Sequence, residues 1–220
     1  MTTINQNLTV ATHSQQPETR HLTPETRFQN TIIPECSIVA KSNISAPRTA
    51  QQALIPPWGS IAEWREFHHM LSHTISTSAG ELKRARSQAG AIQEQLLTVS
   101  DIMAQLSAET CTHCPAVCCL SAKIWADFKD ALFWHLTDQA VPLRQTLSHV
   151  NQVCRYLGSQ GCTLPRMSRP FVCTWYLCPT QVSRLKTNPN RDAWEGLQNT
   201  LTSVKRLRHK MENTFVNALL

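Results

Sequence analysis

Eight of the nine cysteines lie between Cys111 and Cys178, and this constrains what the chain can fold around more than any other feature. Four of them stand in the run C-T-H-C-P-A-V-C-C, residues 111–119. Thiolates packed this closely are the donors that soft metal ions prefer. The sequence therefore predicts a metal site, with these candidate ligands: Cys111, Cys114, Cys118, Cys119, Cys154, Cys162, Cys173 and Cys178.

The main alternative use of these cysteines is a disulfide framework, which needs an oxidising compartment. Residues 1–10 are polar and have neither the basic region nor the apolar core of a signal peptide. No stretch approaches the ~20 apolar residues that span a bilayer. The adjacent Cys118 and Cys119 would also need two separate, crowded partners. We therefore expect a cytoplasmic protein whose reduced thiols bind metal, in preference to disulfides or unliganded core thiols.

The spacing of the thiols leaves the kind of metal open. A C-x2-C pair forms a tight turn whose two sulfurs reach one metal, and neighbouring cysteines then point in different directions. Eight thiolates match two four-cysteine zinc sites, whereas four would suffice for a [4Fe-4S] cluster. The sequence predicts zinc or iron as the cofactor and does not apportion the thiols between sites.

Length and composition favour one small, mainly α domain. The chain has 220 residues, of which 41% are hydrophobic, with only six Gly and two Tyr. We expect a helical domain over residues 56–220, with cysteine-rich metal-binding loops over 111–179. Residues 1–55 are rich in Thr, Gln, Asn, Ser and Pro, which predicts a disordered polar tail. Cys36 lies in this tail and is predicted to be a spare thiol.

Apolar residues that recur every three or four positions predict helices around the cysteine loops. The predicted helices cover residues 58–71, 82–106, 122–136, 142–150 and 192–220. A Ser/Thr-rich break at 72–78 separates the first two of these helices.

Two further segments contain the remaining cysteines: C-R-Y-L-G-S-Q-G-C-T-L-P at 154–165 and R-P-F-V-C-T-W-Y-L-C at 169–178. Together with the run at 111–119, they resemble the YkgJ-like cysteine-cluster family, a zinc- or iron-chelating family with a C-x2-C-x2-C-C signature. The resemblance covers residues 111–179, about a third of the chain. It implies metal binding more firmly than any reaction. Most family members have no established activity, and a related cysteine region occurs in flagellin lysine N-methylases.

The chain departs from the family pattern at two places. Three residues separate Cys114 from Cys118 where the family commonly has two, and Thr174 follows Cys173 where the family often has Arg. The first loop is therefore expected to be reshaped and one charge outside the ligands to be missing. Arg169 remains, and we assign it to orienting or neutralising the thiolates. The alternative is a surface arginine before a turn proline.

Histidines are weaker candidates for ligands. His113 lies inside the first cysteine turn, but eight thiols already supply two complete ligand sets, so we expect it not to bind metal. His69 and His73 stand four residues apart beside His68, a spacing that can chelate metal. No glutamate completes an H-E-x-x-H motif, so we interpret these three as surface or interface histidines.

A basic run, K-R-L-R-H-K at 205–210, is the strongest indication of a nucleic-acid partner, because clustered cations neutralise phosphates. The formal net charge of +6 points the same way. However, eight thiolates and two Zn²⁺ would bring that charge down to about +2. Binding to nucleic acid is therefore possible on this sequence and weakly supported.

Motifs for common catalytic mechanisms are absent from the sequence. It has no phosphate-binding glycine loop, no hydrolase nucleophile motif and no carboxylate pair for acid–base catalysis. No catalytic residue is predicted, and an enzyme is less favoured than a binding protein. Three hypotheses remain: a zinc- or iron-binding protein without an assignable activity, an iron–sulfur redox protein or protein-methylation-related enzyme, and a metal-stabilised nucleic-acid-binding regulator.

Serine substitutions test the cysteine assignment. Cys114→Ser or Cys173→Ser should lower metal content and thermal stability together, because each removes a predicted ligand and metal binding contributes to folding. Cys36→Ser should change neither. Elemental analysis and thermal unfolding check this, and equal metal content in all three variants would contradict the assignment.

Overall fold

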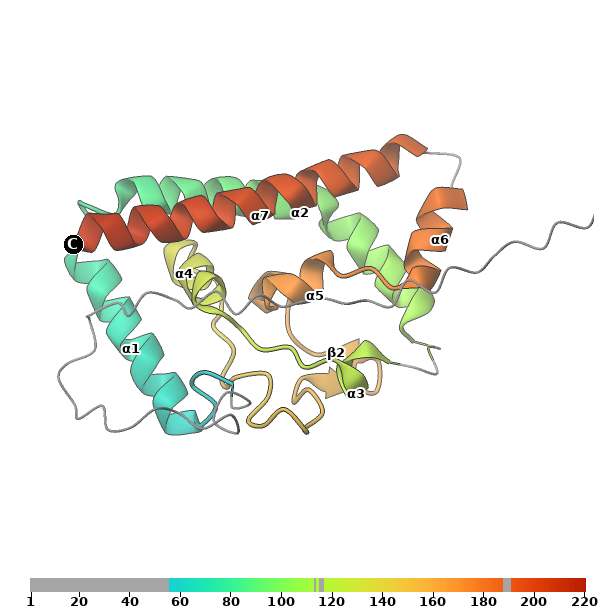
Figure 1. Ribbon diagram of the computed structural model, residues 1–220, viewed down its shortest axis with the longest axis horizontal. Helices are drawn as coiled ribbons and strands as arrows, with labels where there is room; N and C mark the ends of the chain where they lie inside the picture. The colour runs from blue at the N-terminus through green and yellow to red at the C-terminus, as the bar shows by residue number, and fades with distance from the viewer. Residues whose placement is uncertain (1–55, 113, 115–116, 188–190) are drawn as a thin grey trace, which may run out of the picture. The chain divides into compact units, whose positions relative to one another are not determined.

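Two long helices run antiparallel and side by side, and the rest of the domain packs on this pair in the computed structural model (Figure 1). They are α2 (Lys83–Thr110) and α7 (Arg191–Leu219). Buried residues recur along both helices at alternating three- and four-residue steps, the spacing of helices that pack nearly parallel to each other. In α2 and at its N-cap these residues are Leu82, Ala85, Ala89, Ile92, Leu96, Val99, Met103 and Leu106.

The structure describes residues 56–112, 114, 117–187 and 191–220. They lie in one compact unit. The predicted disordered tail, including Cys36, and His113 fall outside the described residues. Across the described part of the chain, no helix is both long and apolar enough to cross a membrane.

Shorter elements complete a mainly helical domain. The other helices are α1 (Ile61–Thr77), α3 (Cys118–Ser121), α4 (Phe128–Leu136), α5 (Phe171–Trp175) and α6 (Pro179–Thr187). A turn of 3-10 helix, η2 (Arg166–Ser168), precedes α5. Strands β1 (Leu157–Gly158) and β2 (Gly161–Cys162) form a small antiparallel hairpin in which Leu157 pairs with Cys162.

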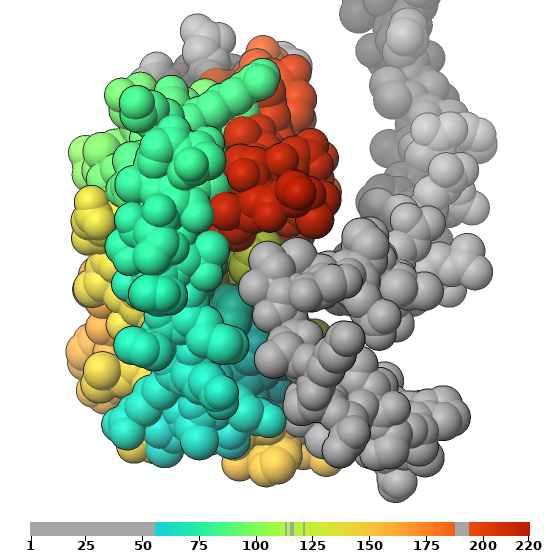
Figure 2. All heavy atoms as spheres, turned by 90° about the vertical axis from the view of Figure 1, so that its left-hand side faces the viewer, coloured from blue at the N-terminus to red at the C-terminus, as the bar shows by residue number. Residues whose placement is uncertain are grey.

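The core divides into two apolar clusters along the α2–α7 pair. The larger joins α1, α4 and the N-terminal half of α2 to the C-terminal half of α7, where Met211 and Phe215 are buried. The smaller joins the C-terminal half of α2 to Leu185 of α6 and Leu197 near the start of α7. The N-terminal half of α2 lies beside the C-terminal half of α7, and the reverse, because the two helices are antiparallel. Figure 2 views one end of the domain, where the red end of α7 lies against the green start of α2.

The predictions for the two long helices are confirmed to within a few residues. The first predicted helix continues past its expected end at residue 71 and reaches Thr77. The buried face of the helix explains this, because Ile75 is buried four residues after Leu71 and continues the same apolar stripe. The break between the two helices is therefore shorter than predicted.

The helix predicted over 122–136 begins only at Phe128. Asp127 is its N-cap, and its carboxylate accepts from the backbone N–H of Asp130 at 2.8 Å. The carboxylate of Asp130 accepts from the N–H of Asp127 in return, which completes a capping box. This box determines where α4 starts.

The helix predicted over 142–150 is wrong, because this segment consists of turns and irregular backbone. Its buried Gln145 holds the backbone of Ala126 on both sides, accepting from its N–H at 2.7 Å and donating to its carbonyl at 3.1 Å. Thr146 donates to the carbonyl of Ile124 at 2.6 Å. These contacts satisfy the backbone of the extended segment before α4, which explains why neither stretch is helical.

His68 is buried, which corrects the prediction that it lies at the surface, while His69 and His73 are exposed. Its Nδ1 lies 2.8 Å from Nε2 of His135 on α4, and its ring packs against the edge of Trp64. Burial and the neighbouring His135 lower the pKa of His68 to about 4. Burial also lowers the pKa of His135. The pair is therefore neutral at pH 7.

The lowered pKa of His68 predicts acid sensitivity. The unfolded chain binds a proton at this histidine near pH 6.5, whereas the folded chain excludes it down to about pH 4. The free energy of unfolding should therefore fall as the pH drops through this window, by on the order of 2 kcal/mol. Urea unfolding at pH 7 and pH 4.5 measures it.

The control for this prediction is the neighbouring exposed histidine. His68→Phe should make the pH dependence shallower, while His69→Gln should leave it as in the wild type. A wild-type slope in His68→Phe would show that another group is responsible.

Candidate metal centre

The predicted cysteine ligands gather around the C-terminal end of α2, where α3, the hairpin, α5 and α6 also lie (Figure 1). Cys111 follows α2, Cys118 and Cys119 open α3, and Cys162 is in β2. All eight are reduced and partly buried. Short elements separated by turns thus bring thiols from residues 111 to 178 into one region.

Four of the thiols form what we call the first thiol group: Cys111, Cys114, Cys118 and Cys178. Burial raises the pKa of Cys118, and the charges of the three other thiols raise it further. The buried Gln181 joins two members of the group, since its Nε2 lies 3.9 Å from Sγ of Cys111 and its Oε1 accepts from the N–H of Cys178 at 3.2 Å. A backbone contact of 3.3 Å between Cys114 and Cys111 closes the first turn.

The other four form the second thiol group: Cys119, Cys154, Cys162 and Cys173. The backbone N–H of Cys154 donates to the carbonyl of Cys119 at 3.2 Å, and their thiols are hydrogen-bonded. That hydrogen bond lowers the pKa of Cys154 to about 6 and raises that of Cys119. Burial, followed by the charges of Cys162 and Cys154, raises the pKa of Cys173 to about 12.

The adjacent Cys118 and Cys119 therefore interact with different partners. The sequence left this division open, and in the structure the thiols that act electrostatically on Cys118 and on Cys119 form two sets of four. Each set has the number and type of donors found in a structural zinc site or around a [4Fe-4S] cluster. Within the ranges described above, no three His, Cys, Asp or Glu side chains are arranged so that they could hold a metal ion.

Two arginines lie beside the thiol groups. Arg169, predicted to act from outside the ligands, donates to the carbonyls of Leu164 at 3.0 Å and Cys162 at 3.4 Å. Arg166 was missed by the sequence analysis. Burial and the nearby Arg169 lower the pKa of Arg166, while Cys162 and Cys111 act in the opposite direction, so its guanidinium lies near a thiol of each group.

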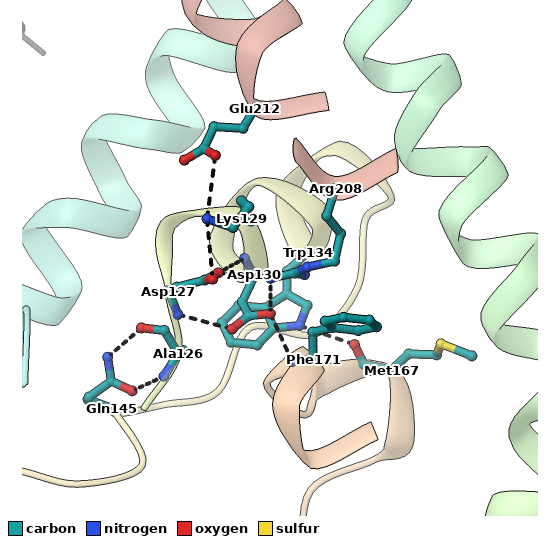
Figure 3. A network of polar contacts seen from close by, with 10 residues as sticks. All are labelled: Ala126, Asp127, Lys129, Asp130, Trp134, Gln145, Met167, Phe171, Arg208 and Glu212. Carbon is teal, nitrogen blue, oxygen red and sulfur yellow. Dashed lines mark hydrogen bonds and ion pairs between the residues drawn. The ribbon is translucent and has the colours of Figure 1, made fainter. Parts of the chain in front are cut away.

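The segment that leads to Cys173 is attached to α4 at two points (Figure 3). Nε1 of Trp134 donates to the carbonyl of Met167 at 3.1 Å. Oδ1 of Asp130 accepts from the backbone N–H of Phe171 at 2.9 Å. Phe171 opens α5 two residues before Cys173. These contacts therefore fix the position of Cys173, one of the four cysteines of the second thiol group.

Arg208 on α7 completes this network (Figure 3). Its Nη2 lies 2.8 Å from Oδ1 of Asp130 and 2.9 Å from Oδ1 of Asp127, and its guanidinium stacks over the ring of Phe171. Only 4% of Arg208 is exposed. Burial raises the pKa of Asp130 to about 6, against the opposing charge of Arg208.

The burial of Arg208 corrects the view of residues 205–210 as one basic surface. Lys205, Arg206 and Lys210 are exposed, but Arg208 belongs to the core. A signal for this was present in the sequence, since position 208 continues the four- and three-residue steps between Val204 and Met211. The D-x-x-D spacing at 127–130 was a second signal. It marks the capping box at the start of α4, whose two aspartates pair with Arg208.

Comparisons of the chain with protein-family models, curated proteins and solved structures found no match. The resemblance to the YkgJ-like cysteine-cluster family therefore stays a prediction.

Substitution of Arg208 tests the buried network. Arg208→Met should lower the free energy of unfolding by about 3 kcal/mol or more, because it leaves two carboxylates without their buried partner. Arg206→Met, two residues away and exposed, should change it by less than roughly 0.5 kcal/mol. Urea unfolding measures both, and equal effects would show that the ion pairs with Asp127 and Asp130 do not stabilise the domain.

Proposed function

We propose that this protein binds two thiophilic metal centres, zinc or iron, one in each thiol group. The observation that carries the proposal is the division of eight cysteines into two sets of four partly buried, reduced thiols. Four cysteine ligands complete the tetrahedral coordination of a structural zinc ion and equally the attachment of one [4Fe-4S] cluster. The resemblance to zinc- or iron-chelating proteins agrees with this proposal.

The surroundings of the groups support the same chemistry. Thiolates held close together repel one another, and a bound cation offsets that repulsion. Donors outside the ligands then orient the sulfurs and reduce the remaining negative charge. Gln181 is such a donor to Cys111 in the first group. Arg169 donates to the backbone carbonyl of Cys162 in the second group, and its role in orienting or neutralising the thiolates stays a prediction.

We propose that the role of the bound metal is structural or metal-handling, since no catalytic residue is assigned. We also propose a reducing compartment, the cytoplasm, because free thiols are maintained there. Iron in either group would instead indicate electron transfer or methylation-related chemistry. The burial of Arg208 weakens the nucleic-acid hypothesis, because one of its cations is already paired with carboxylates.

Metal analysis of the full chain, purified without oxygen and without a metal-binding tag, tests the proposal. We expect about two zinc ions per chain and no colour, or iron with acid-labile sulfide and a broad visible absorption band. Protein that contains neither metal and takes up neither on reconstitution would overturn it.

Single substitutions test whether there are two centres. Cys178→Ser removes a ligand of the first thiol group and Cys173→Ser one of the second, so each should halve the metal content, and the double variant should lose nearly all of it. Cys36→Ser is the control. Loss of all metal in either single variant would indicate one shared centre.

A further inference from the structure

Asp130 connects the core of the domain to the second thiol group. Its carboxylate is almost fully buried and accepts from the N–H of Phe171 while pairing with Arg208. Arg208 also contacts the ring of Phe171, with the guanidinium carbon 4.7 Å from the ring centroid. The first residue of α5 is therefore held through its backbone by one partner and through its side chain by the other (Figure 3).

Cys173 follows directly from this anchored residue. Its own N–H donates to the carbonyl of Pro170 at 2.9 Å, so the turn from Pro170 to Cys173 is closed. A shift of Phe171 would move the Cys173 sulfur with it, because only one residue and a closed turn lie between them.

The first thiol group is supported differently. Gln181 of α6 contacts Cys111 and the backbone of Cys178, and it donates to the hydroxyl of Thr110 at 3.0 Å. These contacts lie at the end of α2, on the side of the smaller apolar cluster. Asp130 and Arg208 both contact Phe171, which belongs to the larger cluster. Each thiol group is thus attached to a different part of the core.

We infer that Asp130 and Arg208 are positioning residues for the second thiol group, which they serve by fixing Phe171 and with it the ligand Cys173. The inference rests on the proposed function. It gives a metal-related role to residues that lie on α4 and α7, outside the cysteine motif. It also separates the two centres, since only the second should respond to substitutions in this network.

The experiment uses Co²⁺ as the probe, because its absorption reports thiolate coordination directly. Full-length chains in which one group is disabled isolate the other: Cys111→Ser with Cys178→Ser leaves the second group, and Cys162→Ser with Cys173→Ser leaves the first. Asp130→Ala and Asp130→Asn are introduced into each background. Asparagine keeps a side-chain oxygen for the N–H of Phe171 and loses the charge, whereas alanine loses both.

We expect Asp130→Ala to weaken Co²⁺ binding at the second group by about tenfold or more, the usual effect of losing a contact outside the ligands. Asp130→Asn should restore binding to within about threefold, because the acceptor is retained. Neither should change binding at the first group by more than about twofold. Lys129→Met is the matched control, since Lys129 lies on the same helix and pairs with Asp127 and Glu212 instead.

A general structural role would give a different result. If Asp130→Ala and Asp130→Asn weakened both groups equally, in proportion to their loss of folding stability, the inference would be overturned. If Asp130→Ala does not fold by circular dichroism, Arg208→Lys decides, because it keeps the positive charge but its shorter side chain weakens the contact with Asp130. Unchanged Co²⁺ affinity at the second group in that variant would equally overturn the inference.

Failure of the proposed function gives a separate result. A wild-type chain that binds no Co²⁺ at either group would sink the proposed function itself. If the wild-type chain binds two Co²⁺ ions and the Asp130→Ala variant binds two equally well, only the inference about positioning is contradicted.

Discussion

A guanidinium buried between helices needs carboxylate partners beside it. In this protein the buried Arg208 and its two carboxylate partners connect the helices in the middle of the domain. Arg208 projects from the apolar face of α7 and takes carboxylates from the first turn of α4. Removing a charge from water costs several kcal/mol unless partners replace the lost hydration. One of those partners, Asp130, is also the residue that holds the start of α5. The contacts of Arg208 and of its partner Asp130 thus hold α7, α4 and α5 together.

Much of the helical framework was predictable because it depends on local periodicity. The apolar steps along α2 and α7 are regular over many turns, and such patterns are the most reliable signal in a sequence. The region between them was not predictable in the same way. The backbone near Ala126 is held by Gln145, which lies nineteen residues further on, and no local pattern encodes such a contact. The helix predicted over 142–150 failed for the same reason.

The candidate site shows the same limit. The sequence indicated which thiols belong to it, since their density alone points to metal, and that assignment remains a prediction. It could not say which thiols lie together, because the grouping is made by contacts across long stretches of chain. Gln181 joins Cys111 to Cys178, and the backbone of Cys154 meets that of Cys119. Arg208 was misjudged because a basic run is ordinarily a solvated face, and here one member follows the apolar stripe.

The adjacency of Cys118 and Cys119 has an electrostatic consequence for the proposed function. One peptide unit joins the two thiol groups, so metal centres bound to them would lie on the order of 10 Å apart. Four thiolates with one divalent ion leave a charge of about −2 on each centre. At that separation the mutual repulsion amounts to several kcal/mol, even at an effective dielectric constant of about 20. Filling one centre would therefore oppose filling the other, and Arg166, beside Cys111 and Cys162, is the cation positioned to reduce that opposition.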